Sequence, residues 1–165
     1  MLSNGASLGG LDGLHLKGGD ARQGRGVLAV GNSTANVGPD VLVSDFEDGL
    51  CAKDNSHINC RHVIVENCSF SGFKAVHRGH LLANYAVARS NPRGFSIDDG
   101  SYLYGHYAEV HGNRIGFLFR NSSAAYCKSA AMTGNKTGIR LQRDCYINAQ
   151  DAQMVDNEED RQVVE

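Results

Sequence analysis

A repeat of 22 residues runs through most of this chain of 165 residues. An asparagine recurs at this interval, and so does a glycine that precedes an aromatic or branched residue. The asparagines are Asn91, Asn113, Asn135 and Asn157, and the glycines are Gly72, Gly94, Gly116 and Gly138. Units of fixed length indicate a solenoid, in which each unit buries its apolar side chains only by stacking on its neighbours.

Within each unit, apolar side chains alternate with other residues, which is typical of strands rather than helices. Phe117 and Phe119 show this alternation in the best-preserved unit, where strands are expected at Tyr102–His106, Tyr107–His111 and Gly116–Arg120. Three strands and three turns in 22 residues make one rung of a parallel β-helix, with rungs about 4.8 Å apart. The sequence therefore predicts an all-β, right-handed parallel β-helix solenoid of about seven rungs with three short strands per rung.

The register is regular in residues 41–165 and fades before them. Gly49-Leu50 lies 23 residues before Gly72-Phe73, so one residue is gained or lost in a turn. Residues 1–40 hold ten of the twenty glycines and are expected to form irregular first rungs. We expect residues 1–165 to be a single β-helix domain.

Stacking explains why the same residue type recurs in each unit. A buried asparagine needs hydrogen-bond partners, which the amides above and below it can supply as a structural ladder. Small inward side chains are expected where the chain turns. This inward column is predicted to contain Ile64, Ala86, Ala108, Ala130 and Ala152.

The units Ser101–Asn121 and Ser122–Asp144 resemble the repeats of right-handed parallel β-helix proteins of the pectate-lyase-like superfamily. This group includes pectate lyases, rhamnogalacturonases, alginate epimerases and phage tailspikes. The resemblance covers about residues 40–165, and the asparagine column is similar to the ladder of the pectate-lyase type. It implies a polysaccharide ligand and, for the tailspike-like members, a homotrimer and other virion proteins as partners.

Composition excludes several other functions. Sixteen basic and eighteen acidic residues leave a net charge of −2, which predicts no nucleic-acid partner. No apolar run approaches the roughly 18 residues of a membrane span, so no membrane insertion is expected. Residues 1–10 lack the pattern of a secretory signal. We expect synthesis in the cytoplasm and a location on a virion or outside the cell after release, and no cofactor.

Aromatic and polar side chains recur on the outward face of the first strand of each unit. Rings pack on the C–H faces of sugars and polar tips bind their hydroxyl groups. The alternative is that aromatic residues simply favour strands, or that another subunit covers them. A further outward line is expected to contain His62, Asn84, His106, Lys128 and Gln150. The candidate substrate-binding residues are His80, Tyr102, Tyr104, His106, Tyr126, Lys128 and Tyr146.

Carboxylates provide candidate catalytic residues at Asp98, Asp99 and Asp144. Glycoside hydrolysis needs two carboxyl groups, about 5 Å apart for retention or about 6.5–9.5 Å for inversion. The alternative is a solvated turn with an exposed ion pair between Asp98 and Arg120. A lyase or epimerase would instead need a base and a group that neutralises a uronate. The residues available for that chemistry are Tyr104, His106, Glu109, His111 and Arg89.

Cysteines and histidines cluster between residues 51 and 68, but their spacing matches no common zinc motif, so free thiols and no metal are expected. Three functions remain open. The first is a tailspike-like or tail-appendage β-helix that recognises a host surface polysaccharide. The second is a polysaccharide lyase, glycoside hydrolase or epimerase. The third is a purely structural virion solenoid.

Overall fold

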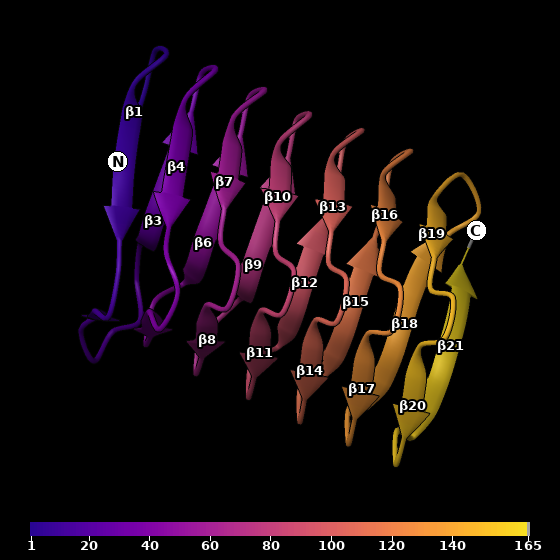
Figure 1. The fold of residues 1–165 in the computed structure, drawn as a ribbon. Helices are drawn as coiled ribbons and strands as arrows, with labels where there is room; N and C mark the ends of the chain where they lie inside the picture. The colour runs from indigo at the N-terminus through magenta and orange to yellow at the C-terminus, as the bar shows by residue number, and fades with distance from the viewer. Residues whose placement is uncertain (165) are drawn as a thin grey trace.

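The computed structural model describes residues 1–164, which form an all-β parallel solenoid of seven rungs (Figure 1). Each rung contributes one strand to each of three sheets, and neighbouring strands pair in parallel. The predicted fold class is therefore confirmed. The chain climbs one rung at a time, so residues about 22 apart in the sequence lie side by side (Figure 1).

The three sheets are numbered here by their first strand. Sheet 1 contains β1 (Ser7–Leu11), β4 (Thr34–Val37), β7 (His57–Asn59), β10 (His80–Leu82), β13 (Tyr102–Tyr104), β16 (Ala124–Tyr126) and β19 (Tyr146–Asn148). Sheet 2 contains β2 (His15–Lys17), β5 (Leu42–Ser44), β8 (Ile64–Glu66), β11 (Val87–Arg89), β14 (Glu109–His111), β17 (Ala131–Thr133) and β20 (Gln153–Val155). Sheet 3 contains β3 (Arg25–Val30), β6 (Asp48–Lys53), β9 (Ser71–Val76), β12 (Arg93–Ile97), β15 (Ile115–Phe119), β18 (Thr137–Gln142) and β21 (Glu159–Val164).

The strands of the best-preserved unit are shorter than the alternation predicted. The first strand ends at Tyr104 and the second begins at Glu109. Between them the chain turns a corner, and Tyr107 there has a φ of 58°. A left-handed backbone cannot continue a strand, and the alternation of side chains does not reveal it.

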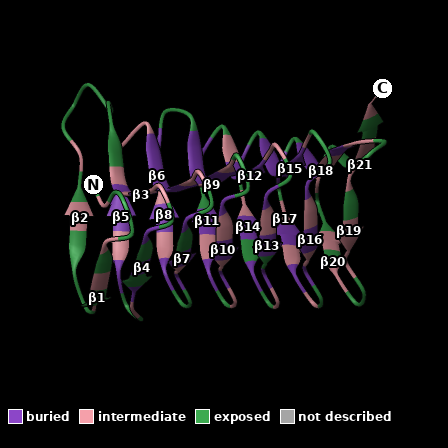
Figure 2. Cartoon of the chain, turned by 90° about the horizontal axis from the view of Figure 1, so that it is seen from above, coloured by how far each residue is buried: buried purple, intermediate pink, exposed green. Residues whose placement is uncertain are grey.

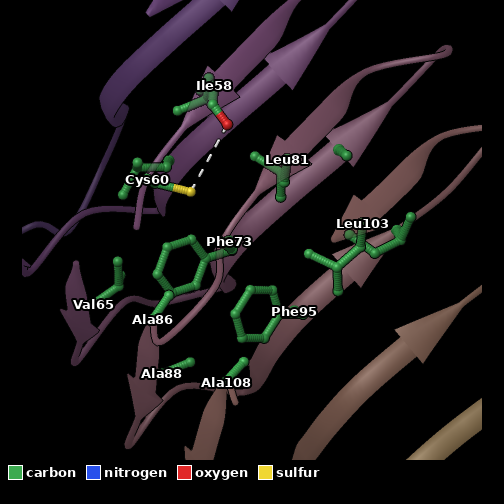
Figure 3. Close-up of a cluster of buried hydrophobic side chains, with 14 of the residues drawn as sticks. Ile58, Cys60, Val65, Phe73, Leu81, Ala86, Ala88, Phe95, Leu103 and Ala108 are labelled. Carbon is green, nitrogen blue, oxygen red and sulfur yellow. Dashed lines mark hydrogen bonds between the residues drawn. The ribbon is translucent and has the colours of Figure 1, made fainter. Parts of the chain in front are cut away.

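The core consists of inward columns that run along the solenoid axis. Phe73, Phe95 and Phe117 are fully buried and stack with ring centroids 4.5 and 5.0 Å apart. Leucines and alanines from sheets 1 and 2 close around these rings (Figure 3). Buried residues are concentrated in the middle rungs, and the first and last rungs are more exposed (Figure 2).

The asparagine ladder is confirmed. The Oδ1 atom of Asn113 accepts the backbone N–H of Asn91 at 3.0 Å and its side-chain amide at 3.3 Å. The Asn113 amide in turn donates to the Ala88 carbonyl at 3.0 Å and to Asn135 Oδ1 at 3.1 Å. Asn135 and Asn157 repeat the pattern one rung on. Each buried amide is thus satisfied by its neighbours along the axis.

From β5 onwards, one connection from sheet 2 to sheet 3 is longer than the others. The connection between β8 and β9 has four residues, Asn67–Phe70, whereas Ser90–Pro92 is the three-residue connection one rung later. The predicted one-residue change in a turn therefore lies here, beside the ladder. It also corrects the inward column, because Val63 and not Ile64 stands one rung before Ala86.

Candidate functional site

The candidate site is the outward face of sheet 1. Leu81, Leu103 and Ala125 point into the core and are fully buried, so the residues on either side of them point outward. The strand register places His80, Tyr102 and Tyr146 along one line, and Tyr104 and Tyr126 along a second. The outward positions predicted from the sequence therefore do share one surface.

The rings on this face form a continuous aromatic surface, called the aromatic face below. Tyr102 lies 5.5 Å from Tyr104 and 6.0 Å from Tyr126 between ring centroids, and Tyr126 lies 6.0 Å from Tyr146. Tyr104 is 38% exposed and Tyr146 53%. The face therefore offers several accessible rings to a ligand that runs along the solenoid.

Sequence reasoning missed His57, which extends the aromatic face by one rung. Its ring lies 4.5 Å from that of His80, which in turn lies 6.1 Å from Tyr102. The spacing from His57 to His80 is 23 residues and not 22, because the longer connection lies between them. Allowing for that extra residue would have placed His57 in the column.

Polar side chains border the aromatic face at the corner between sheets 1 and 2. The His106 backbone N–H donates to Asn84 Oδ1 at 3.0 Å, and Lys128 is exposed one rung further on. The Nδ1 atom of His106 is buried without a hydrogen-bond partner among the described residues. An amide, an imidazole and an ammonium group thus flank the rings and place hydrogen-bonding groups beside them.

His62 does not belong to this polar line, contrary to the prediction. It stacks on Tyr85 at 4.8 Å and Tyr85 stacks on Tyr107 at 5.0 Å, with nearly parallel rings. All three residues have φ values between 58° and 60°. Bulky residues seldom adopt this conformation, and the stacked rings offset its unfavourable energy. This corner stack was missed, although the 22-residue spacing of Tyr85 and Tyr107 could have indicated it.

Two ionisable groups of the aromatic face have pKa values shifted in the direction that favours their neutral forms. Burial and the neighbouring His57 lower the pKa of the His80 imidazole below its usual value. A hydrogen bond with Tyr126, together with burial, raises the pKa of the Tyr102 phenol. Both shifts favour the uncharged form, so the centre of the face suits hydroxyl-rich ligands better than strongly charged ones.

The structure brings two of the three candidate catalytic carboxylates together. The Asn121 side-chain amide donates to Asp98 at 2.6 Å and to Asp99 at 2.9 Å, and the Arg120 guanidinium pairs with Asp98 as expected. Asp144 lies apart and accepts both the N–H and the hydroxyl of Ser122. The Ser122 hydroxyl lowers the pKa of Asp144, whereas a catalytic acid needs a raised pKa.

The residues considered for lyase or epimerase chemistry are divided between two surfaces, with Arg89, Glu109 and His111 together on sheet 2. Glu109 and His111 lie 3.4 Å apart on sheet 2, where Arg89 is paired with Glu66 at 2.6 Å. Tyr104 lies on sheet 1 instead. The strand register places Arg89 next to His111, so a base and a cation lie side by side on sheet 2, where Arg89 is already paired with Glu66.

All five cysteines are free thiols. Burial is the main cause that raises the pKa of Cys51 and Cys68 to about 11 and that of Cys127 to about 12, and it also raises the pKa of Cys60. These thiols are therefore protonated and unreactive at neutral pH. Within residues 1–164, no group of three or more histidine, cysteine or acidic side chains is arranged to hold a metal ion.

Comparison with known proteins identifies no relative: no family model, no curated protein and no solved structure matches this chain. In the described part of the chain there is also no helix with the length and hydropathy needed to cross a membrane.

Proposed function

We propose that this solenoid recognises a host surface polysaccharide through the aromatic face, as a tailspike-like or tail-appendage β-helix. The observation that carries the proposal is the unbroken series of ring contacts from His57 to Tyr146, bordered by Asn84, His106 and Lys128. Rings at each rung would pack on successive sugars, and the polar tips would bind hydroxyl groups. The resemblance of the repeats to β-helix proteins supports the same ligand class.

The proposal is tested with Tyr104→Ala and a panel of purified bacterial capsular and O-antigen polysaccharides. The native protein should retain at least one glycan unmodified, and the variant should bind it about tenfold more weakly because one stacking ring is lost. Tyr107→Ala is the matched control, since it removes an exposed ring of the same rung from the corner stack. No retention by the folded protein, or equal losses in both variants, would sink the proposal.

The same samples separate the other two functions. A hydrolase would release reducing ends, and a lyase would release unsaturated sugars, so either product would replace the binding proposal with an enzymatic one. A purely structural virion solenoid would neither bind nor cleave any glycan of the panel. We further propose a homotrimer, other virion proteins as partners, and a location on a virion or outside the cell.

A further inference from the structure

A cavity of about 240 Å³ lies on the outer side of sheet 3, a different sheet from the aromatic face. Its lining comes from four successive rungs, so only the stacked solenoid assembles it. Three of the six lining residues are arginines, and none is acidic. The lining residues are Phe70, Pro92, Arg93, Arg114, Ile115 and Arg140.

Ile115 provides an apolar part of the cavity lining, and Leu118 follows it in β15. Ile115 and Leu118 are only 7% and 5% exposed, yet neither belongs to the core cluster inside the solenoid. Each pairs in the sheet with an arginine, Ile115 with Arg93 and Leu118 with Arg140. Arginine stems cover such apolar surface while their guanidinium groups reach solvent. The cavity therefore combines an apolar part of its lining with a cationic rim.

Phe70 holds one of these cations in place. It belongs to the connection that is one residue longer than its counterpart, and it is 37% exposed. Its ring centroid lies 4.1 Å from the Arg93 guanidinium carbon and 4.8 Å from the Lys74 ammonium nitrogen. A guanidinium stacked on a ring keeps its N–H edge available for a ligand.

The rim arginines have no carboxylate partner among residues 1–164, unlike the cations next to them. Lys74 pairs with Asp48 at 3.0 Å, and Arg120 pairs with Asp98. Burial lowers the pKa of Arg93, and so do the nearby positive charges of Arg120 and Arg114, while Asp48 and Asp98 act in the opposite direction. A bound anion would relieve this repulsion.

We propose that this cavity binds an oxyanion group, such as a carboxylate, sulfate or phosphate carried by a small ligand or a glycan chain. Guanidinium groups bind such anions through paired N–H donors. Rim arginines from different rungs approach the group from different sides, and the apolar part of the lining accommodates the carbon skeleton that carries it. The inference does not rest on the proposed sugar binding at the aromatic face.

Titration calorimetry with sodium sulfate, glucuronate and glucose tests the site at low ionic strength. Either anion should bind and glucose should not, because glucose lacks only the charged group of glucuronate. Arg114→Gln and Arg140→Gln should each weaken anion binding roughly tenfold. Arg78→Gln removes the same charge from an exposed corner outside the cavity and should leave binding unchanged.

The two anions distinguish the sources of the ligand. Binding of glucuronate in preference to sulfate supports a carboxylate group, and the reverse supports a sulfate or phosphate group. No binding of either anion, equal binding of glucose, or an equal loss in Arg78→Gln would overturn the inference. Tyr104→Ala should not change anion binding, so failure here is separable from failure of the polysaccharide proposal.

Discussion

At the scale of single residues, burial makes the hydrogen bonds of the asparagine ladder important for the stability of this fold. Asn113 is 2% exposed and uses both ends of its amide: it accepts from the preceding rung and donates both to that rung and to the next one. Nothing else among the described contacts is placed to replace it. Stability at this corner therefore depends on residue identity and not on side-chain volume alone.

Asn113→Ala should lower the free energy of unfolding by about 2–4 kcal/mol, because the Ala88 carbonyl and the Asn91 N–H lose their partner inside the protein. Urea denaturation followed by circular dichroism measures this change. Asn157→Ala is the matched control, since Asn157 belongs to the same ladder but is partly exposed, so water can replace its bonds. Equal losses in both variants would contradict the argument.

The buried thiols make a prediction about alkaline pH. An unfolded thiol ionises near its ordinary pKa of 9.0, whereas Cys127 keeps its proton up to about 12. Its contribution is therefore fully present below pH 9 and is lost as the pH rises towards 12, by at most about 1.4 kcal/mol per pH unit.

Cys127→Ala should accordingly show a shallower fall of unfolding free energy with rising pH than the native protein. Urea denaturation from about pH 8 to about pH 11 gives that slope. Cys145→Ala is the control, because Cys145 is partly exposed. Unchanged slopes in Cys127→Ala would show that its thiol does not resist ionisation in the folded state.

At the scale of strands and corners, the glycine column shows how closely the rungs approach one another. A Cβ atom at Gly116 would lie 2.6 Å from the Gly138 carbonyl oxygen and 2.9 Å from the Val110 side chain. The first contact is with backbone, which cannot move without separating two rungs. Glycine is therefore required here by space and not by backbone conformation.

Gly116→Ala should destabilise the protein by about 1–3 kcal/mol through overpacking between β15 and β18. Thermal and urea denaturation measure the loss. Gly9→Ala in β1 is the control, because a Cβ atom there meets nothing within 4 Å. A Gly116→Ala variant as stable as Gly9→Ala would mean that the rungs can separate at little energetic expense.

The columns could be predicted because each rung presents the same environment to the same position. Ser101 and Ser123 also lie one rung apart and are both buried. Their 22-residue spacing could have predicted this column, which was missed. Ile64 was misplaced because the extra residue between β8 and β9 shifts the register before it. The arginine cavity was not predicted because the residue type changes at each step: Phe70, Pro92 and Arg114 are 22 residues apart, but they share no chemistry that would mark a column.

At the scale of the whole molecule, the direction in which a strand residue points decides whether its side chain lies in the core or on the surface. Inward positions of the core are apolar along the axis, while outward positions differ between sheets: aromatic rings gather on sheet 1 and arginines line the cavity on sheet 3. Exposed aromatic surface such as that of Tyr104 and Tyr146 also marks sites of contact with other chains. Subunit contacts and glycan binding would therefore compete for the same exposed rings of the aromatic face.

Light scattering behind a sizing column tests assembly directly. We expect a mass of three times 17.7 kDa, as for tailspike-like solenoids, with part of the exposed aromatic surface covered in the trimer. Tyr146→Ala should weaken the trimer if the end of the face lies in the interface. A clean monomer would count against the tailspike-like proposal and would leave the whole face open to a glycan.

The extra residue between β8 and β9 lengthens one rung without changing how the strands of that rung pair with their neighbours. The backbone hydrogen bonds of each rung restore the register within a few residues, so the added length changes only the corner. Phe70 stands in the enlarged corner, and the core columns beneath it are undisturbed. Corners are thus the places where such a chain can acquire a new surface by a single insertion, with no compensating change elsewhere.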